Sequence, residues 1–118
     1  RQVNVYQIWC NLKPGVRDHE FMTELTRYLE KLKADGKLEH FRILRAKLGL
    51  APRELREFCI MLEFDDLAQL DAAFGQVATR ADPIESLHHA VNSRVQDVMF
   101  ALYRDFPDPV RSYGQEKF

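Results

Sequence analysis

Strand-like and helical segments alternate along this chain in the order β-α-β-β-α-β, and that order constrains the fold more than any other feature. Apolar residues alternate with others in the strand-like segments and recur at helical spacing in the segments between them. Two right-handed crossovers in this order place both helices on the same face of a four-stranded antiparallel sheet. The sequence therefore predicts an α+β, ferredoxin-like fold, with strands at residues 3–12, 40–46, 57–64 and 95–104 and main helices at residues 17–34 and 67–77.

Charged residues and a proline mark the helix ends. Asp18 and Glu20 lie in the first turn of the 17–34 segment and lysines lie in its last turn, which matches the helix dipole. A further helix start is predicted at Asp82, because Pro83 suits the first helical position and Glu85 is spaced to bond back to the cap.

One face of the predicted sheet has no helix to cover it. On a register of strict alternation, that face carries Tyr6, Ile8, Cys10, Leu44, Ala46, Cys59, Met61, Met99, Ala101 and Tyr103. Such a patch is larger than the apolar area that soluble monomers usually expose. We therefore expect a homodimer whose two sheets pack face to face into a dimeric α/β barrel, with Tyr6, Ile8, Leu44, Met61 and Met99 in the interface. Trp9, on the other face of the first strand, is expected to anchor the core.

Length and charge set the remaining bounds. The chain has 118 residues, of which 46% are hydrophobic and 30% charged, which is typical of one domain spanning residues 1–118. We expect a core at about 3–105 and an extended tail at 106–118, where prolines block helix and ladder pairing. A net charge of -1 argues against a nucleic-acid partner. No apolar run is long enough to span a membrane and none resembles a signal, so a cytoplasmic location without a membrane partner is the default.

The same register predicts a ligand site inside the barrel, lined by Tyr6, Cys10, Arg42, Cys59, Met61, Asp97 and Tyr103. A few polar groups within an apolar cavity are typical of a small-molecule site. A tyrosine there could donate a hydrogen bond, Asp97 could act as a base, and Arg42 could hold a carboxylate or enolate. The alternative is structural: Arg42 and Asp97 pair across the dimer and fix its register. A slip of one residue would move all of these side chains to the helix side.

The histidines and cysteines suggest no metal site or cofactor. His88 and His89 are adjacent and point about 100° apart on a helix, so they cannot chelate one ion, and His19 and His40 lie in other segments. His88 is expected on the inner face of its helix and His89 in solvent.

Two thiols and a basic segment each have a structural and a functional interpretation. Cys10 and Cys59 fall in neighbouring strands, where they are either buried apolar side chains or a redox pair. Basic residues concentrate between Arg42 and Arg56, which indicates either a solvated loop or a nucleic-acid surface. The lack of interleaved aromatic residues favours the loop.

The first strand leading into Asn-Leu-Lys-Pro-Gly-Val at 11–16, and the closing strand ending in Ala-Leu-Tyr-Arg-Asp at 101–105, resemble the stress-responsive α/β barrel family. The resemblance covers residues 3–105 and implies a homodimeric barrel with a central cavity. Members and cousins of that family bind ligands, act as small-molecule cyclases or monooxygenases, or have no known activity. Family members often carry a histidine on the barrel face of the first strand, where this chain has Tyr6, so the cyclase residues do not carry over.

Three functional hypotheses follow. The leading one is a small homodimer of uncharacterised activity that binds a small organic ligand. The runner-up is an enzyme, cyclase-like or monooxygenase-like, that acts on a small aromatic or polyketide-like substrate through Tyr6, Asp97 and Arg42. The third is a haem- or metal-dependent activity.

Overall fold

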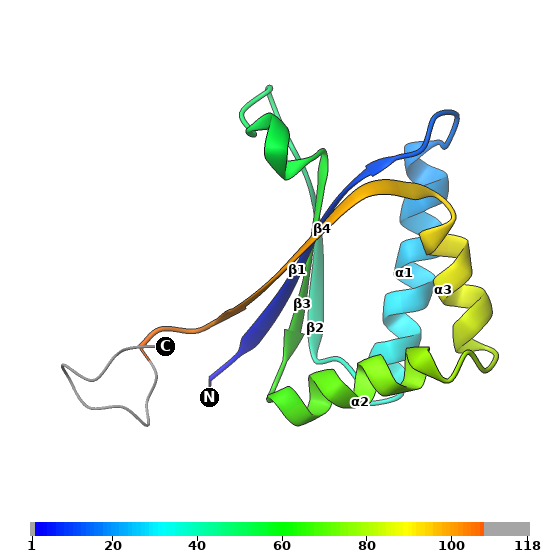
Figure 1. The fold of residues 1–118 in the computed structure, drawn as a ribbon, viewed down its shortest axis with the longest axis vertical. Coiled ribbons are helices and arrows are strands. Elements are labelled where there is room, and N and C mark those ends of the chain that lie inside the picture. The colour runs from blue at the N-terminus through cyan, green and yellow to red at the C-terminus, as the bar shows by residue number, and fades with distance from the viewer. Residues whose placement is uncertain (1, 108–118) are drawn as a thin grey trace.

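Residues 2–107, which the computed structural model describes, form a four-stranded antiparallel sheet with three helices on one side of it (Figure 1). The sheet order is β2-β3-β1-β4, so the two crossovers place β1 and β3 at its centre. The ferredoxin-like α+β prediction is confirmed. The elements in chain order are β1 Asn4–Leu12, α1 Asp18–Ala34, β2 His40–Arg45, the short 3-10 helix η1 Arg53–Leu55, β3 Phe58–Phe64, α2 Leu67–Ala78, α3 Ile84–Asn92 and β4 Val95–Arg104.

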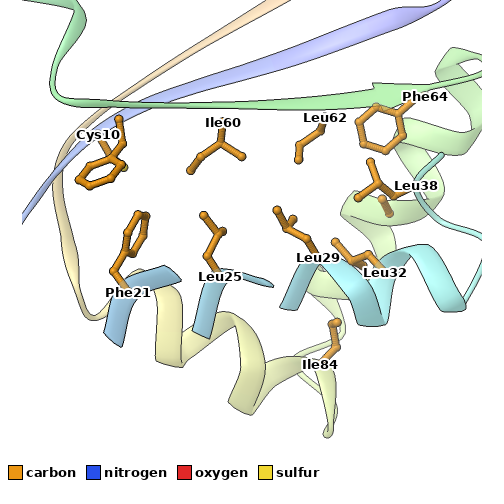
Figure 2. Close-up of a cluster of buried hydrophobic side chains, with 12 residues drawn as sticks. Cys10, Phe21, Leu25, Leu29, Leu32, Leu38, Ile60, Leu62, Phe64 and Ile84 are labelled. Carbon is orange, nitrogen blue, oxygen red and sulfur yellow. The ribbon is translucent and has the colours of Figure 1, made fainter. Parts of the chain in front are cut away.

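The core lies between the sheet and α1. Figure 2 shows the side chains of β3 pointing toward a stripe of apolar side chains on α1. Alternate residues of β3, from Phe58 to Phe64, are buried. This is the face of the strand that the sequence predicts to be buried, because it is the more apolar of the two. Each fully buried apolar side chain contributes roughly 2 kcal/mol of transfer free energy, so this layer supplies most of the driving force for folding. The buried α1 residues are Phe21, Leu25, Leu29 and Leu32.

The second crossover consists of α2 and α3 rather than one helix. The Asp66 carboxylate accepts a hydrogen bond from the Gln69 backbone N–H at 2.8 Å and caps α2. At α3 the predicted cap box does not form: the helix begins at Ile84, and the carboxylate of Asp82 accepts bonds from the backbone N–H and hydroxyl of Ser86. The helix therefore starts one residue later than predicted, with Pro83 rather than Asp82 at the N-cap position.

The pairing of β1 with β3 decides which face of β1 is buried. Tyr6 lies opposite Leu62, and Cys10 lies opposite Phe58, so the even-numbered residues of β1 point toward the helices. Cys10 is 1% exposed. The prediction that Tyr6, Ile8 and Cys10 lie on the uncovered face is therefore wrong by one residue of register.

Trp9 occupies the face that the helices leave open. It lies opposite Cys59 on β3 and opposite Met99 on β4. The prediction that Trp9 anchors the core is wrong for the same reason. Both faces of β1 carry apolar residues, so alternation alone cannot show which face is buried, and the partner strand decides.

The uncovered face is nevertheless largely apolar. Leu44, Met61 and Met99 lie on it as predicted, and residues of odd number on β1 take the place of Tyr6 and Ile8. The side chains that share this face are Val5, Gln7, Trp9, His40, Arg42, Leu44, Cys59, Met61, Glu63, Met99, Ala101 and Tyr103.

The predicted tail falls mostly outside the described residues, which end at 107. Within residues 2–107, no helix has the length and apolar character needed to cross a membrane.

Candidate functional site

An apolar cavity of about 470 Å³ lies between the helix-facing side of the sheet and the three helices. β1, β3 and β4 supply one wall, and α1, α2 and α3 supply the other. Among the described residues, no Asp, Glu, Lys or Arg side chain lines it. A cavity of this size, apolar with a few polar groups, is typical of a small-molecule site.

Three aromatic rings gather on one side of the cavity. The Tyr6 ring packs edge-on against Phe74 of α2, with centroids 5.3 Å apart, and stacks on Phe100 of β4 at 5.7 Å. Phe74 and Phe100 line the cavity yet are 47% and 61% exposed. The cavity therefore opens to solvent beside these rings, where β4 extends away from the helices (Figure 1).

Polar groups lie on the helix side of the cavity. Tyr28 of α1 and His88 of α3 both line it, and their ring centroids are 5.5 Å apart. Neither side chain, nor the Tyr6 hydroxyl, forms a hydrogen bond with another residue in the range 2–107. Because unpaired polar groups are costly inside a protein, groups placed in this way are available to a ligand or to water.

Burial sets the protonation of the cavity tyrosines and thiol. Burial and the nearby Tyr6 hydroxyl raise the pKa of Tyr28 to about 12. Burial also raises the pKa of Tyr6. Burial raises the pKa of Cys10 to about 11, with smaller contributions from Cys59 and Glu57. All three groups are therefore neutral near pH 7, the tyrosines as hydrogen-bond donors and Cys10 as an unreactive thiol.

The structure divides the sequence-predicted ligand residues between the two faces of the sheet. Tyr6 and Cys10 line the helix-side cavity. The other predicted residues of β2, β3 and β4, apart from Asp97 in its bulge, lie on the opposite face of the sheet. The predicted set is thus not one site within a single chain; the members on the uncovered face are Arg42, Cys59, Met61 and Tyr103.

Asp97 has a structural environment of its own, in a bulge of β4. The β1–β4 register shifts between Trp9 and Asn11, and Asp97 takes a positive φ of 57° there. Its carboxylate accepts a bond from the Asn11 amide at 3.2 Å, and its carbonyl accepts one from Arg56 Nε at 2.9 Å. Arg42 is on β2, at the opposite edge of the sheet, so the two side chains do not pair within one chain, and the pair expected across the dimer stays a prediction.

Helical spacing predicts that His88 lies on the inner face of its helix, but nothing in the sequence assigns His88 or Tyr28 to a site. Helical spacing gives the inward direction of both side chains. It does not give the distance between α1, α3 and the sheet, which creates the cavity. His89, the next residue on the same helix, is exposed. The contrast between the two adjacent histidines is the sequence signal that could have identified His88 as the inward-facing one.

The described residues contain no group of three or more His, Cys, Asp and Glu side chains arranged to hold a metal ion. Cys10 and Cys59 are both free and project from opposite faces of the sheet. They cannot form a disulfide with each other in this fold.

The architecture and the cavity define the class of protein: a ferredoxin-like α+β fold with an apolar pocket between its sheet and its helices. The chain belongs to DUF6614, a family of unknown function whose model matches residues 3–118. None of the curated proteins matches the chain in sequence.

Solved structures share the fold at low sequence identity. A dimeric ferredoxin-like protein of unknown function from Jannaschia sp. CCS1 matches with a TM-score of 0.64 and 11% identity, over 86% of this chain and 97% of that one. A second, from Thermobifida fusca, matches with a TM-score of 0.60 and 15% identity, over 86% and 90% of the two chains. SnoaB, a cofactor-independent oxygenase from Streptomyces nogalater, matches with a TM-score of 0.63 and 9% identity, over 93% and 97%. At these identities the likeness concerns the fold alone.

Proposed function

We propose that this protein is a homodimer that binds a small, mainly apolar aromatic molecule in the cavity between its sheet and helices. The observation that carries the proposal is the cavity itself, with exposed aromatic rings at its opening and unpaired Tyr28 and His88 side chains on its helix side. Aromatic walls favour a planar ligand, because offset-stacked and edge-on ring contacts add to the burial of apolar area. A site between two sheets of the dimer, expected from the sequence, stays a prediction.

A second copy of the chain is the natural cover for the open face of the sheet. The apolar residues of that face, including Trp9 and Met99, have no other element of residues 2–107 packed on them. Solved proteins of the same fold are described as dimeric. A twofold arrangement lets one patch cover itself, which agrees with the modest charge of this face.

The connection between β2 and β3 adds apolar surface to the proposed dimer. Leu48 and Leu50 are 89% and 81% exposed. Figure 1 shows η1 and the loop before it beyond the ends of β2 and β3, away from the helices. The connection between β2 and β3 can therefore contact a partner that packs on the open face.

An enzymatic role is the second candidate, and the likeness to SnoaB is its support. The triad expected from sequence, Tyr6, Asp97 and Arg42, lies on separate faces and edges of one sheet, so that form of the hypothesis loses its basis. Membership of the stress-responsive family likewise stays a prediction from residues 11–16 and 101–105.

Titration with 2-naphthol tests the binding proposal. Ala73 is 3% exposed and lines the cavity, whereas Ala72 is exposed on the same helix. We expect wild type to bind with a Kd of about 0.1 mM, from roughly 0.5 kcal/mol per non-hydrogen atom of the ligand. Ala73→Leu should weaken binding at least about fivefold because it fills the cavity, and Ala72→Leu should not. Equal binding by wild type and Ala73→Leu, or no binding by wild type, would refute the proposal.

A further inference from the structure

The ionisable side chains of the cavity are few and come from three elements. Tyr6 and Cys10 project from β1, Tyr28 projects from α1 and His88 projects from α3. β3, β4 and α2 contribute no titratable side chain to the described lining. Of these side chains, Tyr28 contacts His88, and their ring centroids are 5.5 Å apart.

Tyr28 and His88 differ in what they can do for a ligand. A neutral tyrosine hydroxyl donates a hydrogen bond, and burial keeps Tyr28 neutral across the physiological range. A neutral imidazole presents one nitrogen that accepts a proton, and histidine is the side chain that most often serves as a general base. Neither side chain has a hydrogen-bond partner among residues 2–107. The Tyr28 hydroxyl can therefore donate a hydrogen bond to a bound group while the His88 nitrogen accepts a proton from the same group.

A ligand hydroxyl attached to an unsaturated ring matches this pair. Its oxygen can accept a bond from Tyr28 while its proton points at His88. An aliphatic alcohol would bind in the same way but would not ionise, because its acidity is far too low for imidazole. A phenol or enol has both the planar shape that suits the Tyr6, Phe74 and Phe100 rings and an acidity within reach of histidine.

Resting on the proposed ligand-binding function, we propose that the cavity takes a planar phenol or enol and that His88 removes its hydroxyl proton while Tyr28 hydrogen-bonds the resulting oxyanion. The O–H bond breaks, its electron pair stays on the ligand oxygen, and an N–H bond forms on His88. Nothing is oxidised or reduced in this step. The product is a phenolate or enolate beside an imidazolium, the electron-rich form in which such rings react at carbon.

Two electrostatic effects oppose each other in this step. The apolar lining disfavours charge and would raise the pKa of a bound phenol on its own. The adjacent imidazolium and the Tyr28 hydrogen bond favour the oxyanion, and charge-assisted hydrogen bonds are the stronger kind. The second effect dominates for ligands that are nearly as acidic as histidine, so an acidic phenol is the best probe.

The test uses 4-nitrophenol, whose phenolate has a visible absorption band, and its methyl ether, 4-nitroanisole, which has no proton to lose. At one pH unit below the pKa of free 4-nitrophenol, we expect the bound ligand to show at least a fivefold higher ratio of phenolate to phenol than the free ligand. His88→Gln should abolish this increase and His89→Gln, on the exposed side of the same helix, should preserve it. Tyr28→Phe should reduce it and serves as a second variant should His88→Gln fail to fold.

The outcomes separate the two proposals. Equilibrium dialysis that shows no binding of either compound would overturn the proposed function. Binding of both compounds with 4-nitrophenol held only as neutral phenol would overturn this inference and leave the binding function standing. A phenolate signal that survives His88→Gln would also overturn it, because another group would then be the base.

Discussion

Trp9 of β1 lies directly opposite Met99 of β4, on the face of the sheet that no helix covers. Its neighbour Cys10 is 1% exposed beneath α1. Because successive side chains of a strand point to opposite faces, Trp9 lies on the open face of the sheet and Cys10 lies in the core.

That relationship makes Met99 a test of the dimer. Met99→Lys places an ammonium group in the proposed interface, where burial of an unpaired charge costs about 2 kcal/mol or more and weakens the dimer roughly 30-fold. Met22→Lys is the matched control, because Met22 is 42% exposed on α1. Sedimentation velocity across a dilution series measures how readily the dimer of each variant dissociates. A monomeric wild type at micromolar concentration would contradict the dimer.

Trp9 also supplies an internal probe, since it is the only tryptophan of the chain. We expect its fluorescence emission to shift to longer wavelength as dilution separates the subunits, because water then replaces the partner's apolar surface. In Met99→Lys the shifted spectrum should be present at all concentrations. A spectrum that does not change with concentration in either protein would place Trp9 outside the interface.

The two thiols should differ in reactivity. Burial raises the pKa of Cys10 to about 11, so little thiolate is present near pH 7 and the sulfur is inaccessible as well. Cys59 is half-buried on the open face. In a thiol-labelling assay, Cys59 should react before Cys10, which should react only after unfolding. Labelling of Cys59 should be slower at high protein concentration than at low concentration, because the dimer covers the open face. Rapid labelling of a Cys59→Ser variant would show that the cavity wall opens.

The core layer predicts a large loss of stability at Phe21. This side chain is fully buried and packs edge-on against Phe58, with ring centroids 5.1 Å apart. Phe21→Ala should lower the free energy of unfolding by about 3–5 kcal/mol, through lost burial and a residual cavity. Met22, the exposed neighbour of Phe21, serves as control: Met22→Ala should lower the free energy of unfolding by less than about 1 kcal/mol in the same urea titration.

Asp35 should make stability depend on pH in acid. Its carboxylate accepts bonds from the Gln76 amide at 3.0 Å and from Lys31 Nζ at 3.1 Å, and these bonds lower the pKa of Asp35. A lowered folded-state pKa means that the stabilisation is present above the ordinary aspartate pKa and is lost as pH falls through the lowered value.

Asp35→Asn should therefore have a lower thermal midpoint than wild type near neutral pH, and the difference should vanish in acid. Asp71→Asn is the control, because Asp71 is exposed on α2 and has no hydrogen-bond or ion-pair partner in residues 2–107. A constant difference between wild type and Asp35→Asn at every pH would mean that the charge of Asp35 contributes nothing.

The sequence by itself determined the element order, the ferredoxin-like topology and the buried face of β3. Those features follow from local periodicity and chain connectivity. In β3 the Phe58, Ile60, Leu62 and Phe64 face is clearly more apolar than the other, and it is buried. The direction of His88 followed from helical spacing in the same way.

Only the tertiary structure decided the register of β1 and the position of the candidate site. Both faces of β1 are apolar, so the assignment of Tyr6 to the helices and Trp9 to the open face depends on pairing with β3 and β4 and on the bulge at Asp97. The cavity between Tyr6, Tyr28 and His88 depends on how far the helices stand from the sheet. That distance is set by packing among residues far apart in the chain, which no local pattern records.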